Sequence, residues 1–320
     1  MLRELRKQTV GYRLPSFLTM LFISLEVVMD VTIPFLMAYL LDRGIDGGDL
    51  SQILFWGAVL LLCASIALLF GVLAGHFAAK ASTGFAKNVR RKLYYNVQDF
   101  SFSNIDRFAT SSLVTRLTTD VTNVQHAYQM LIRIAVRSPA MLIFSFFMAL
   151  NINKTLSTVY LVSLPILGIG LFFIIRAAYP VFSHVFKVYD RLNTVVQENI
   201  RAIRVVKSFV REPEEIKKFS TVSEEIFQDF TKAEKIVAFN SPLMQGMMYL
   251  SLLAISYIAA HLIASSSMTT GQLMSFITYT SQILMSLMML SMVFVMITIS
   301  KASALRIEEV LQEKSDIVEK

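Results

Sequence analysis

The chain has 320 residues, of which 55% are hydrophobic and 17% are charged, and its mean hydropathy is +0.58. Soluble domains carry about 25% charged residues, so this composition excludes an ordinary soluble globular protein. The formal net charge of +7 is compatible with nucleic acid or anionic lipid as a partner. Charged blocks alternate with long uncharged stretches, and this placement favours lipid.

Six apolar stretches predict six transmembrane helices, because each approaches or exceeds the roughly 20 residues needed to cross a bilayer. The last two come from one uncharged stretch, Ile236–Ser300, which is too long for one crossing and is divided by a polar patch at residues 265–271. A basic segment, residues 1–13, precedes the first span and predicts an interfacial lead-in helix. The expected spans are 14–41, 52–79, 136–152, 154–176, 237–263 and 271–300.

Two long charged loops, residues 80–135 and 177–236, lie on the same side of these spans. The short loops on the other side contain only Arg43 and Lys154 as basic residues, so 28 of the 30 lysines and arginines lie on the side of the long loops or at its membrane border. The positive-inside rule predicts that this side is cytoplasmic, and an even number of spans places both termini there.

The helices are expected to extend beyond the membrane. No proline occurs from Gln52 to Gln98, and 47 residues in one helix would reach about 70 Å. The hydrocarbon core takes only about 30 Å, so the remainder would form a stalk outside it. In this stalk, Leu113, Leu117 and Val121 repeat at helical spacing, which predicts packing between helices. Arg116 and Asp120 lie four residues apart, where they can pair.

Two interruptions at 101–108 and 208–214 divide the charged loops, and each combines an aromatic residue with charged residues. Exposed aromatic residues at the tip of a stalk often dock into a partner. The alternative is a simple helix–turn–helix corner with its aromatic residue packed into the stalk.

Glu26 and Asp30 lie four residues apart in the first span and so share a helix face. Carboxylates at membrane depth are costly and usually face a cavity or a partner, which suggests contact with a cationic substrate or protonation during transport. An interhelical hydrogen bond or a hydrated cavity wall is the alternative. Arg133 and Arg137 are expected to reach lipid headgroups. Their pairing with these carboxylates is less favoured, because Asp30 lies near the outer end of its span.

The last span carries a row of methionines, whose flexible side chains adapt to varied apolar shapes. With two aromatic residues upstream they form a candidate substrate path, although ordinary core filling explains most methionines. His76 and His261 are isolated, and no metal-ligand spacing occurs, so no metal site is predicted. The candidate path residues on this span are Phe276, Tyr279, Met285, Met288, Met292 and Met296.

Three segments carry a resemblance to a known family. Residues 102–121, FSNIDRFATSSLVTRLTTDV, resemble the first intracellular loop of ABC exporter transmembrane domains, and residues 197–219, QENIRAIRVVKSFVREPEEIKKF, resemble the second. Residues 303–311, SALRIEEVL, resemble the end of the sixth span. The similarity is in order along the whole chain, and it is greatest to subunits of bacterial heterodimeric multidrug exporters.

The resemblance implies an all-α membrane protein, with six long helices per subunit and two subunits around a central path. It implies short coupling helices near 103–109 and 208–215, which dock on nucleotide-binding domains and transmit ATP-driven closure to the membrane. Carried over by position, the docking residues are Ser103, Asn104, Ile105, Asp106, Arg107 and Phe108 at the first tip, and Ser208, Phe209, Val210, Arg211, Glu212 and Glu215 at the second.

The family usually continues into a nucleotide-binding domain, which binds ATP and Mg²⁺. No G-x-x-x-x-G-K-[ST] phosphate loop occurs in these 320 residues. Residues 313–320 are therefore expected to begin a linker to that domain on a longer polypeptide, with a separate ATPase subunit as the alternative. No catalytic residues are identified on this chain, so ATP hydrolysis is expected only of the complete translocase.

The expected function is export of hydrophobic or amphipathic compounds, such as drugs, across the bacterial plasma membrane by alternating access. A lipid or peptide exporter of the same fold is an alternative, and so, from another class, is a channel or a regulatory membrane scaffold. The second transmembrane subunit is expected to be a different chain, and a homodimer is also possible.

Overall fold

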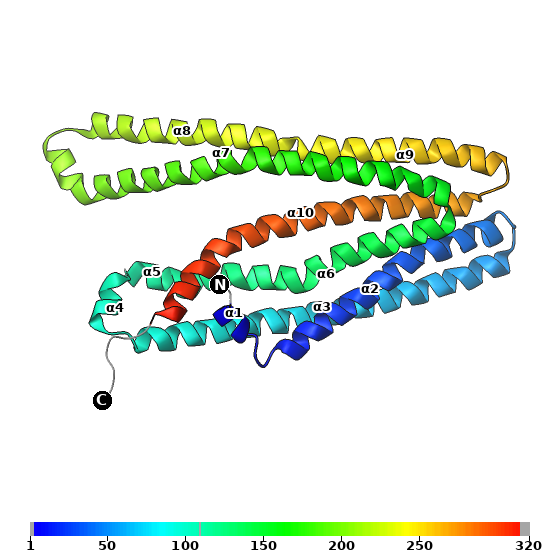
Figure 1. Ribbon diagram of the computed structural model, residues 1–320, viewed down its shortest axis with the longest axis horizontal. Helices are drawn as coiled ribbons and strands as arrows, with labels where there is room; N and C mark the ends of the chain where they lie inside the picture. Colours follow the sequence, from blue (N-terminus) through cyan, green and yellow to red (C-terminus); the bar gives the residue numbers. More distant parts are fainter. Residues whose placement is uncertain (1–2, 109, 314–320) are drawn as a thin grey trace. The chain divides into compact units, whose positions relative to one another are not determined.

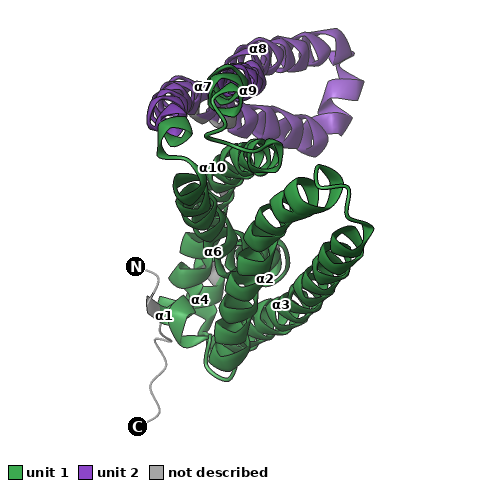
Figure 2. Cartoon of the chain, turned by 90° about the vertical axis from the view of Figure 1, so that its right-hand side faces the viewer, with its two compact units in different colours: residues 1–157, 255–320 green, residues 158–254 purple. Residues whose placement is uncertain are grey.

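The computed structural model describes residues 3–108 and 110–313, and every regular element in these ranges is helical (Figure 1). The chain divides into two compact units, Met1–Ser157 with Ile255–Lys320 and Thr158–Ala254 (Figure 2). The elements in chain order are α1 Arg3–Lys7, α2 Arg13–Tyr39, η1 Leu40–Ile45, α3 Leu50–Gln98, α4 Phe102–Arg107, α5 Thr110–Thr115, η2 Arg116–Asp120, α6 Val121–Ile152, α7 Lys154–Ser208, α8 Glu212–Ala238, α9 Asn240–Ala264 and α10 Thr270–Gln312.

Six continuous helical segments are long and apolar enough to cross a membrane, and each contains one expected span. They also confirm the expected extensions. The helix α3 has 49 residues and α7 has 55, so at about 1.5 Å per residue both are roughly 70–80 Å long. The segments that contain the spans are Arg13–Ile45, Leu50–Gln98, Ser112–Ile152, Lys154–Ser208, Glu212–Ala264 and Thr270–Gln312.

In the first unit, α2 packs on α3 and α6, and α10 packs on α6 and α2. One end of this bundle is closed by hydrogen bonds between the short loops. Asp42 accepts a bond from the Thr269 hydroxyl at 2.6 Å and one from the Gly271 backbone at 2.9 Å. Gly271 is required here, because a Cβ atom would lie 2.6 Å from the Ala38 carbonyl oxygen.

The opposite, charged end of the first unit has its own apolar core. Leu113 and Val121 are buried in it, and Leu117 packs against it, which confirms the helical packing expected from their spacing. Leu5 of α1 is buried in the same cluster, so the lead-in helix is fastened to the bundle. This core therefore extends the bundle well beyond the apolar spans.

Arg116 and Asp120 do not pair with each other as expected. They lie in η2, a π-helical turn, and both side chains reach α10 instead. Asp120 accepts a hydrogen bond from Arg306 Nε at 2.8 Å, and Arg116 Nη2 lies 2.8 Å from Glu309 Oε2. Interhelical partners replace the local pair because α10 brings both a cation and a carboxylate alongside this turn.

These ion pairs lie in the charged extensions, outside the expected spans. Burial by itself raises the pKa of Asp120, but the hydrogen bonds from Arg306 and Ser303 and the charges of Arg306 and Arg116 outweigh it, so the pKa is lower than usual. The hydrogen bond with Asp120 raises the pKa of Arg306. The pair is therefore charged at neutral pH and fastens η2 to α10.

Candidate functional site

The first tip is the short helix α4, which begins with a capping box. The Ser101 side chain accepts a bond from the Asn104 backbone, and Asn104 Oδ1 accepts one from the Ser101 backbone at 3.1 Å. Phe102 at the start of α4 is 86% exposed, whereas Phe108 after its end is buried and stacks on Phe100. The tip thus combines one exposed and one packed aromatic residue. The exposed ring was not among the docking residues assigned from the sequence.

The remaining residues assigned to this tip divide by exposure. Ser103, Ile105 and Arg107 are exposed, and Asn104 is buried. The side chain of Asp106 lies outside the described part of the chain. Two of these residues hold the tip to the end of α10, because Asn104 Nδ2 donates to Glu313 Oε1 at 2.9 Å and Arg107 Nη1 lies 3.0 Å from Glu313 Oε2. The first tip is thereby fastened to the C-terminal end of α10, beyond the expected sixth span.

The second tip is a turn and not the separate short helix expected near 208–215. The helix α7 continues to Ser208 and α8 begins at Glu212, with a proline in its first turn. The Arg211 N–H bonds to the Val206 carbonyl and the Val210 N–H to that of Lys207, which is the Schellman arrangement at a helix end. This arrangement ends α7 and leaves residues 209–211 between it and α8.

Four of the six docking residues expected here are exposed, and Glu212 and Glu215 are partly buried. Phe209 is 73% exposed and Val210 is 75% exposed. Val210 adopts φ +51°, a conformation that branched residues rarely adopt. Glu215 accepts a bond from Asn199 at 3.1 Å, and Glu212 lies 3.5 Å from Lys207, so α7 and α8 are fastened just behind the tip. Ser208 and Arg211 are also at the surface.

A charged cluster lies inside the membrane segment of the first unit. Arg137 Nη2 donates to Asp30 Oδ2 at 2.7 Å, and Nη1 pairs with Glu26. The expectation that Arg137 reaches headgroups in preference to these carboxylates is wrong. Its long side chain extends to α2, and the two carboxylates, one helical turn apart, provide a site that can be satisfied at membrane depth.

This cluster is connected to two further helices. The Gln282 side chain of α10 donates to the Asp30 carbonyl at 3.4 Å and accepts a bond from Ser145 of α6 at 2.9 Å. A Cβ atom added at Gly71 of α3 would lie 3.4 Å from the Glu26 carboxyl group. One guanidinium can balance one of the two carboxylates, so part of the charge is compensated within the bundle itself.

The candidate path residues of α10 divide between two environments. Met285, Met288 and Met292 are exposed, and Met296 is partly buried. Phe276 and Tyr279 are fully buried, and the Tyr279 hydroxyl donates to the Val31 carbonyl at 2.7 Å. Tyr279 therefore holds α10 to α2 and Phe276 is an interior residue, so of these candidates the methionine row supplies the exposed apolar surface.

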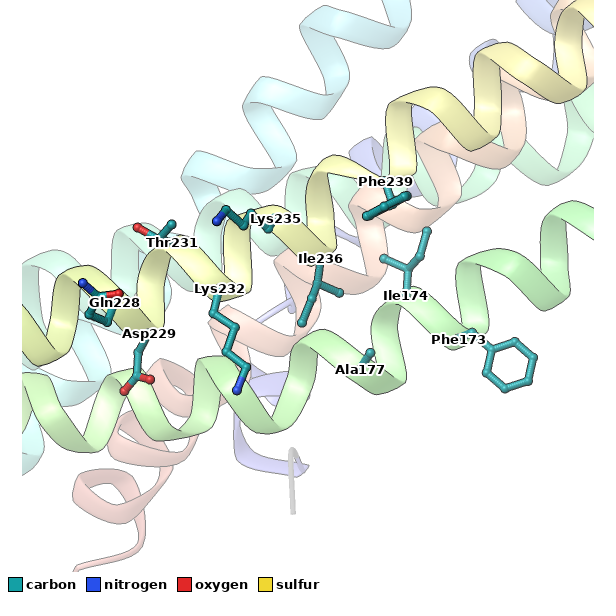
Figure 3. Close-up of a pocket in the computed structure, with 10 residues that line it drawn as sticks. All are labelled: Phe173, Ile174, Ala177, Gln228, Asp229, Thr231, Lys232, Lys235, Ile236 and Phe239. Carbon is teal, nitrogen blue, oxygen red and sulfur yellow. The ribbon is translucent and has the colours of Figure 1, made fainter.

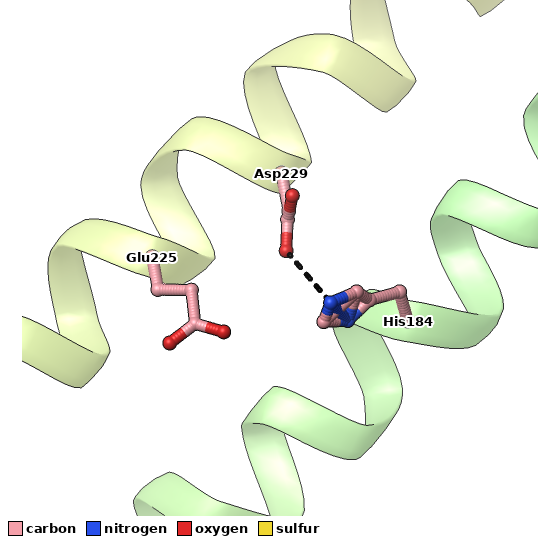
Figure 4. Close-up of side chains that lie close together, drawn as sticks. All are labelled: His184, Glu225 and Asp229. Carbon is pink, nitrogen blue, oxygen red and sulfur yellow. Dashed lines mark ion pairs between the residues drawn. The ribbon is translucent and has the colours of Figure 1, made fainter.

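One group of metal-ligand side chains occurs where the sequence predicted none. His184 of α7 and Glu225 and Asp229 of α8 bring their ligand atoms within 4.8 Å of one another (Figure 4). One imidazole and two carboxylates can hold a divalent transition metal. Ion pairs explain the group without a metal, because Glu225 already pairs with Arg191 and His184 is 56% exposed beside Asp229. Sequence spacing missed the group because its members lie on two helices.

Comparisons with known proteins cover nearly all of these elements. A family model described as the ABC transporter transmembrane region matches residues 16–288. The chain is 32% identical over 305 residues to the uncharacterized ABC transporter ATP-binding protein YfiB of Bacillus subtilis, covering 95% of this chain and 53% of that protein.

Two further relatives show the same partial coverage. The uncharacterized ABC transporter ATP-binding protein Rv1273c of Mycobacterium tuberculosis is 28% identical over 311 residues, 97% of this chain and 53% of the relative. The ATP-dependent lipid A-core flippase of Pseudomonas fluorescens is 26% identical over 262 residues, 76% of this chain and 43% of the relative. The chain thus spans about half the length of these relatives.

Proposed function

The chain belongs to the ABC transporter transmembrane region family as an exporter transmembrane domain, and we propose that it moves hydrophobic or amphipathic compounds, drugs among them, out of the cytoplasm by alternating access. The observation that carries the substrate class is the row of exposed methionines on α10, Met285, Met288 and Met292. Flexible thioethers on an apolar surface suit ligands of varied shape. Glu26 and Asp30 are candidates for contact with cationic compounds. Unchanged transport of such compounds by Asp30→Asn would contradict that contact.

Nucleotide-binding domains, with ATP and Mg²⁺ bound to them, drive this movement through the two tips. Support comes from the exposed Phe102 and Phe209 at the ends of the long extensions and from relatives named as ATP-binding proteins whose length this chain covers by half. The chain itself forms the path and the lever. A second, different transmembrane subunit completes the path, with a homodimer as the alternative.

The transporter lies in the bacterial plasma membrane with both termini in the cytoplasm. This orientation is supported by the charged extensions, which carry nearly all lysines and arginines, as the positive-inside rule requires of cytoplasmic segments.

Lipid export is the second candidate function, because one relative is named a lipid A-core flippase. Transport by the full-length transporter and its partner subunit, reconstituted in vesicles, distinguishes export of amphipathic compounds from export of lipid. The two substrates offered are a fluorescent amphipathic dye and a fluorescent phospholipid. ATP-dependent movement of the dye alone supports the proposal, and movement of the lipid alone replaces it with the second candidate. Flux that is independent of ATP would indicate a channel instead.

A further inference from the structure

A groove lies between α7 and the junction of α8 with α9, where both helical segments change from apolar to charged sequence (Figure 3). Its volume of about 660 Å³ is in the range of small-molecule sites. On α7 the uncharged stretch ends at Ile175, and on α8 Lys235 is the last charged residue before the uncharged stretch. The groove therefore lies at the membrane border of its unit.

The two ends of the groove differ in chemistry. Toward the membrane it is lined by Ile174, Ile236 and Phe239, and toward the charged extension by Lys232 and Lys235. Figure 3 shows Lys232 and Ile236 extending from α8 toward α7. This order, apolar walls followed by cations, matches the order of an acyl chain and a phosphate in a lipid.

The two lysines of the groove are available to a ligand. Among the hydrogen bonds and ion pairs within residues 3–108 and 110–313, none involves Lys232 or Lys235, and both side chains are exposed. Asp229 Oδ2, beside them, is shielded from solvent without a hydrogen-bond donor, and His184 Nε2 at 3.9 Å is too distant to supply one. The Asp229 side chain as a whole is 25% exposed, so a ligand in the groove that donates a hydrogen bond to this carboxylate gains affinity.

We propose that this groove binds one phospholipid from the leaflet on the charged side of the bundle. Lys232 and Lys235 hold its phosphate, and an acyl chain lies against Ile236 and Phe239. The exposed part of the Asp229 carboxylate accepts a hydrogen bond from the headgroup. An ethanolamine ammonium donates such a bond and a trimethylammonium does not, so the groove prefers phosphatidylethanolamine to phosphatidylcholine.

Tryptophan quenching by lipids with brominated chains tests this proposal without ATP or transport. The test uses the full-length transporter with its partner subunit and the substitution Phe239→Trp. The quenching measured in the same protein with Phe239 retained is subtracted as background. The vesicles contain a minor fraction of brominated phosphatidylethanolamine or brominated phosphatidylcholine. If the groove binds this lipid, brominated phosphatidylethanolamine should quench the introduced tryptophan more than random contact at the same fraction of the bilayer would.

Charge variants connect the quenching to the groove. A lysine near an anionic membrane surface contributes about a fivefold factor in affinity, so for one zwitterionic lipid Lys232→Gln with Lys235→Gln should weaken binding by up to about 30-fold. The double arginine variant should restore binding. Lys217→Gln with Lys218→Gln makes the same charge change on α8 about 15 residues away, roughly 22 Å along the helix, and should have no effect.

The opposite results overturn the proposal. Quenching that is unaffected by removing Lys232 and Lys235, or equally affected by the remote pair, excludes a phosphate site in the groove. Absence of quenching by either lipid would mean that the partner subunit covers the groove. Equal quenching by both headgroups would refute the role assigned to Asp229.

Discussion

The charged cluster at membrane depth gives the sharpest test of the bundle's energetics. Arg137→Gln removes the guanidinium that bridges Glu26 and Asp30 and leaves two carboxylates one helical turn apart. Loss of one partner of a fully buried ion pair costs about 3–5 kcal/mol. The side chains of Glu26, Asp30 and Arg137 are 14%, 25% and 37% exposed, so we expect a smaller loss of about 2–3 kcal/mol.

The assay is thermal unfolding of the detergent-purified full-length transporter, scanned at one fixed rate. With an unfolding entropy of about 2.1 cal/mol/K per residue, 320 residues shift their midpoint by about 1.5 °C for each kcal/mol, so Arg137→Gln should lower it by about 3–5 °C. The triple variant Glu26→Gln, Asp30→Asn and Arg137→Gln removes every charge with little change in shape. It should recover most of the loss, because replacing a whole buried ion pair is often neutral.

A matched arginine controls for the loss of charge alone. Arg133 lies one turn earlier on α6 and is exposed, so Arg133→Gln should shift the midpoint by less than about 1 °C, as for most surface substitutions. The reasoning is refuted if Arg137→Gln unfolds at the wild-type temperature, or if the triple variant is no more stable than the single one.

Three further predictions concern the charged extensions. Phe209→Ala should leave stability within about 0.5 kcal/mol but abolish ATP-stimulated transport. Phe227→Ala, also at an exposed position on α8, should leave transport intact, and unchanged coupling in Phe209→Ala would undermine the docking role. Val210→Gly should slow hydrogen exchange at the turn, because it relieves about 1 kcal/mol of left-handed strain; faster exchange would contradict this. Asp120→Asn should cost about 2 kcal/mol by weakening the bonds from Arg306, measured by thermal unfolding. The pKa of Asp120 is lowered from 3.8. The stabilisation that its ionised carboxylate provides is therefore complete above that value and is lost only as the pH falls through the folded pKa. The stability lost in Asp120→Asn should thus be constant from about pH 5 to 8.

The sequence by itself determined the helical class, the six spans and the long extensions. These features depend on local properties: the length of an apolar stretch, the absence of proline and the spacing of apolar residues. Each is visible within one segment, as in Leu50–Gln98, where the expected continuous helix is confirmed. The two tips were also found locally, because aromatic and charged residues interrupt the helical pattern there.

The tertiary structure decided which side chains meet. Arg137 pairs with carboxylates more than a hundred residues away, and Asp120 pairs with Arg306 and not with Arg116. Phe276 is buried, whereas Met285 and Met288 further along α10 are exposed, since helix packing and not residue type sets the face that each presents. Ion pairs, interior positions and the groove between α7 and α8 depend on the rotation and register of neighbouring helices, and no single helix encodes these quantities in its own sequence.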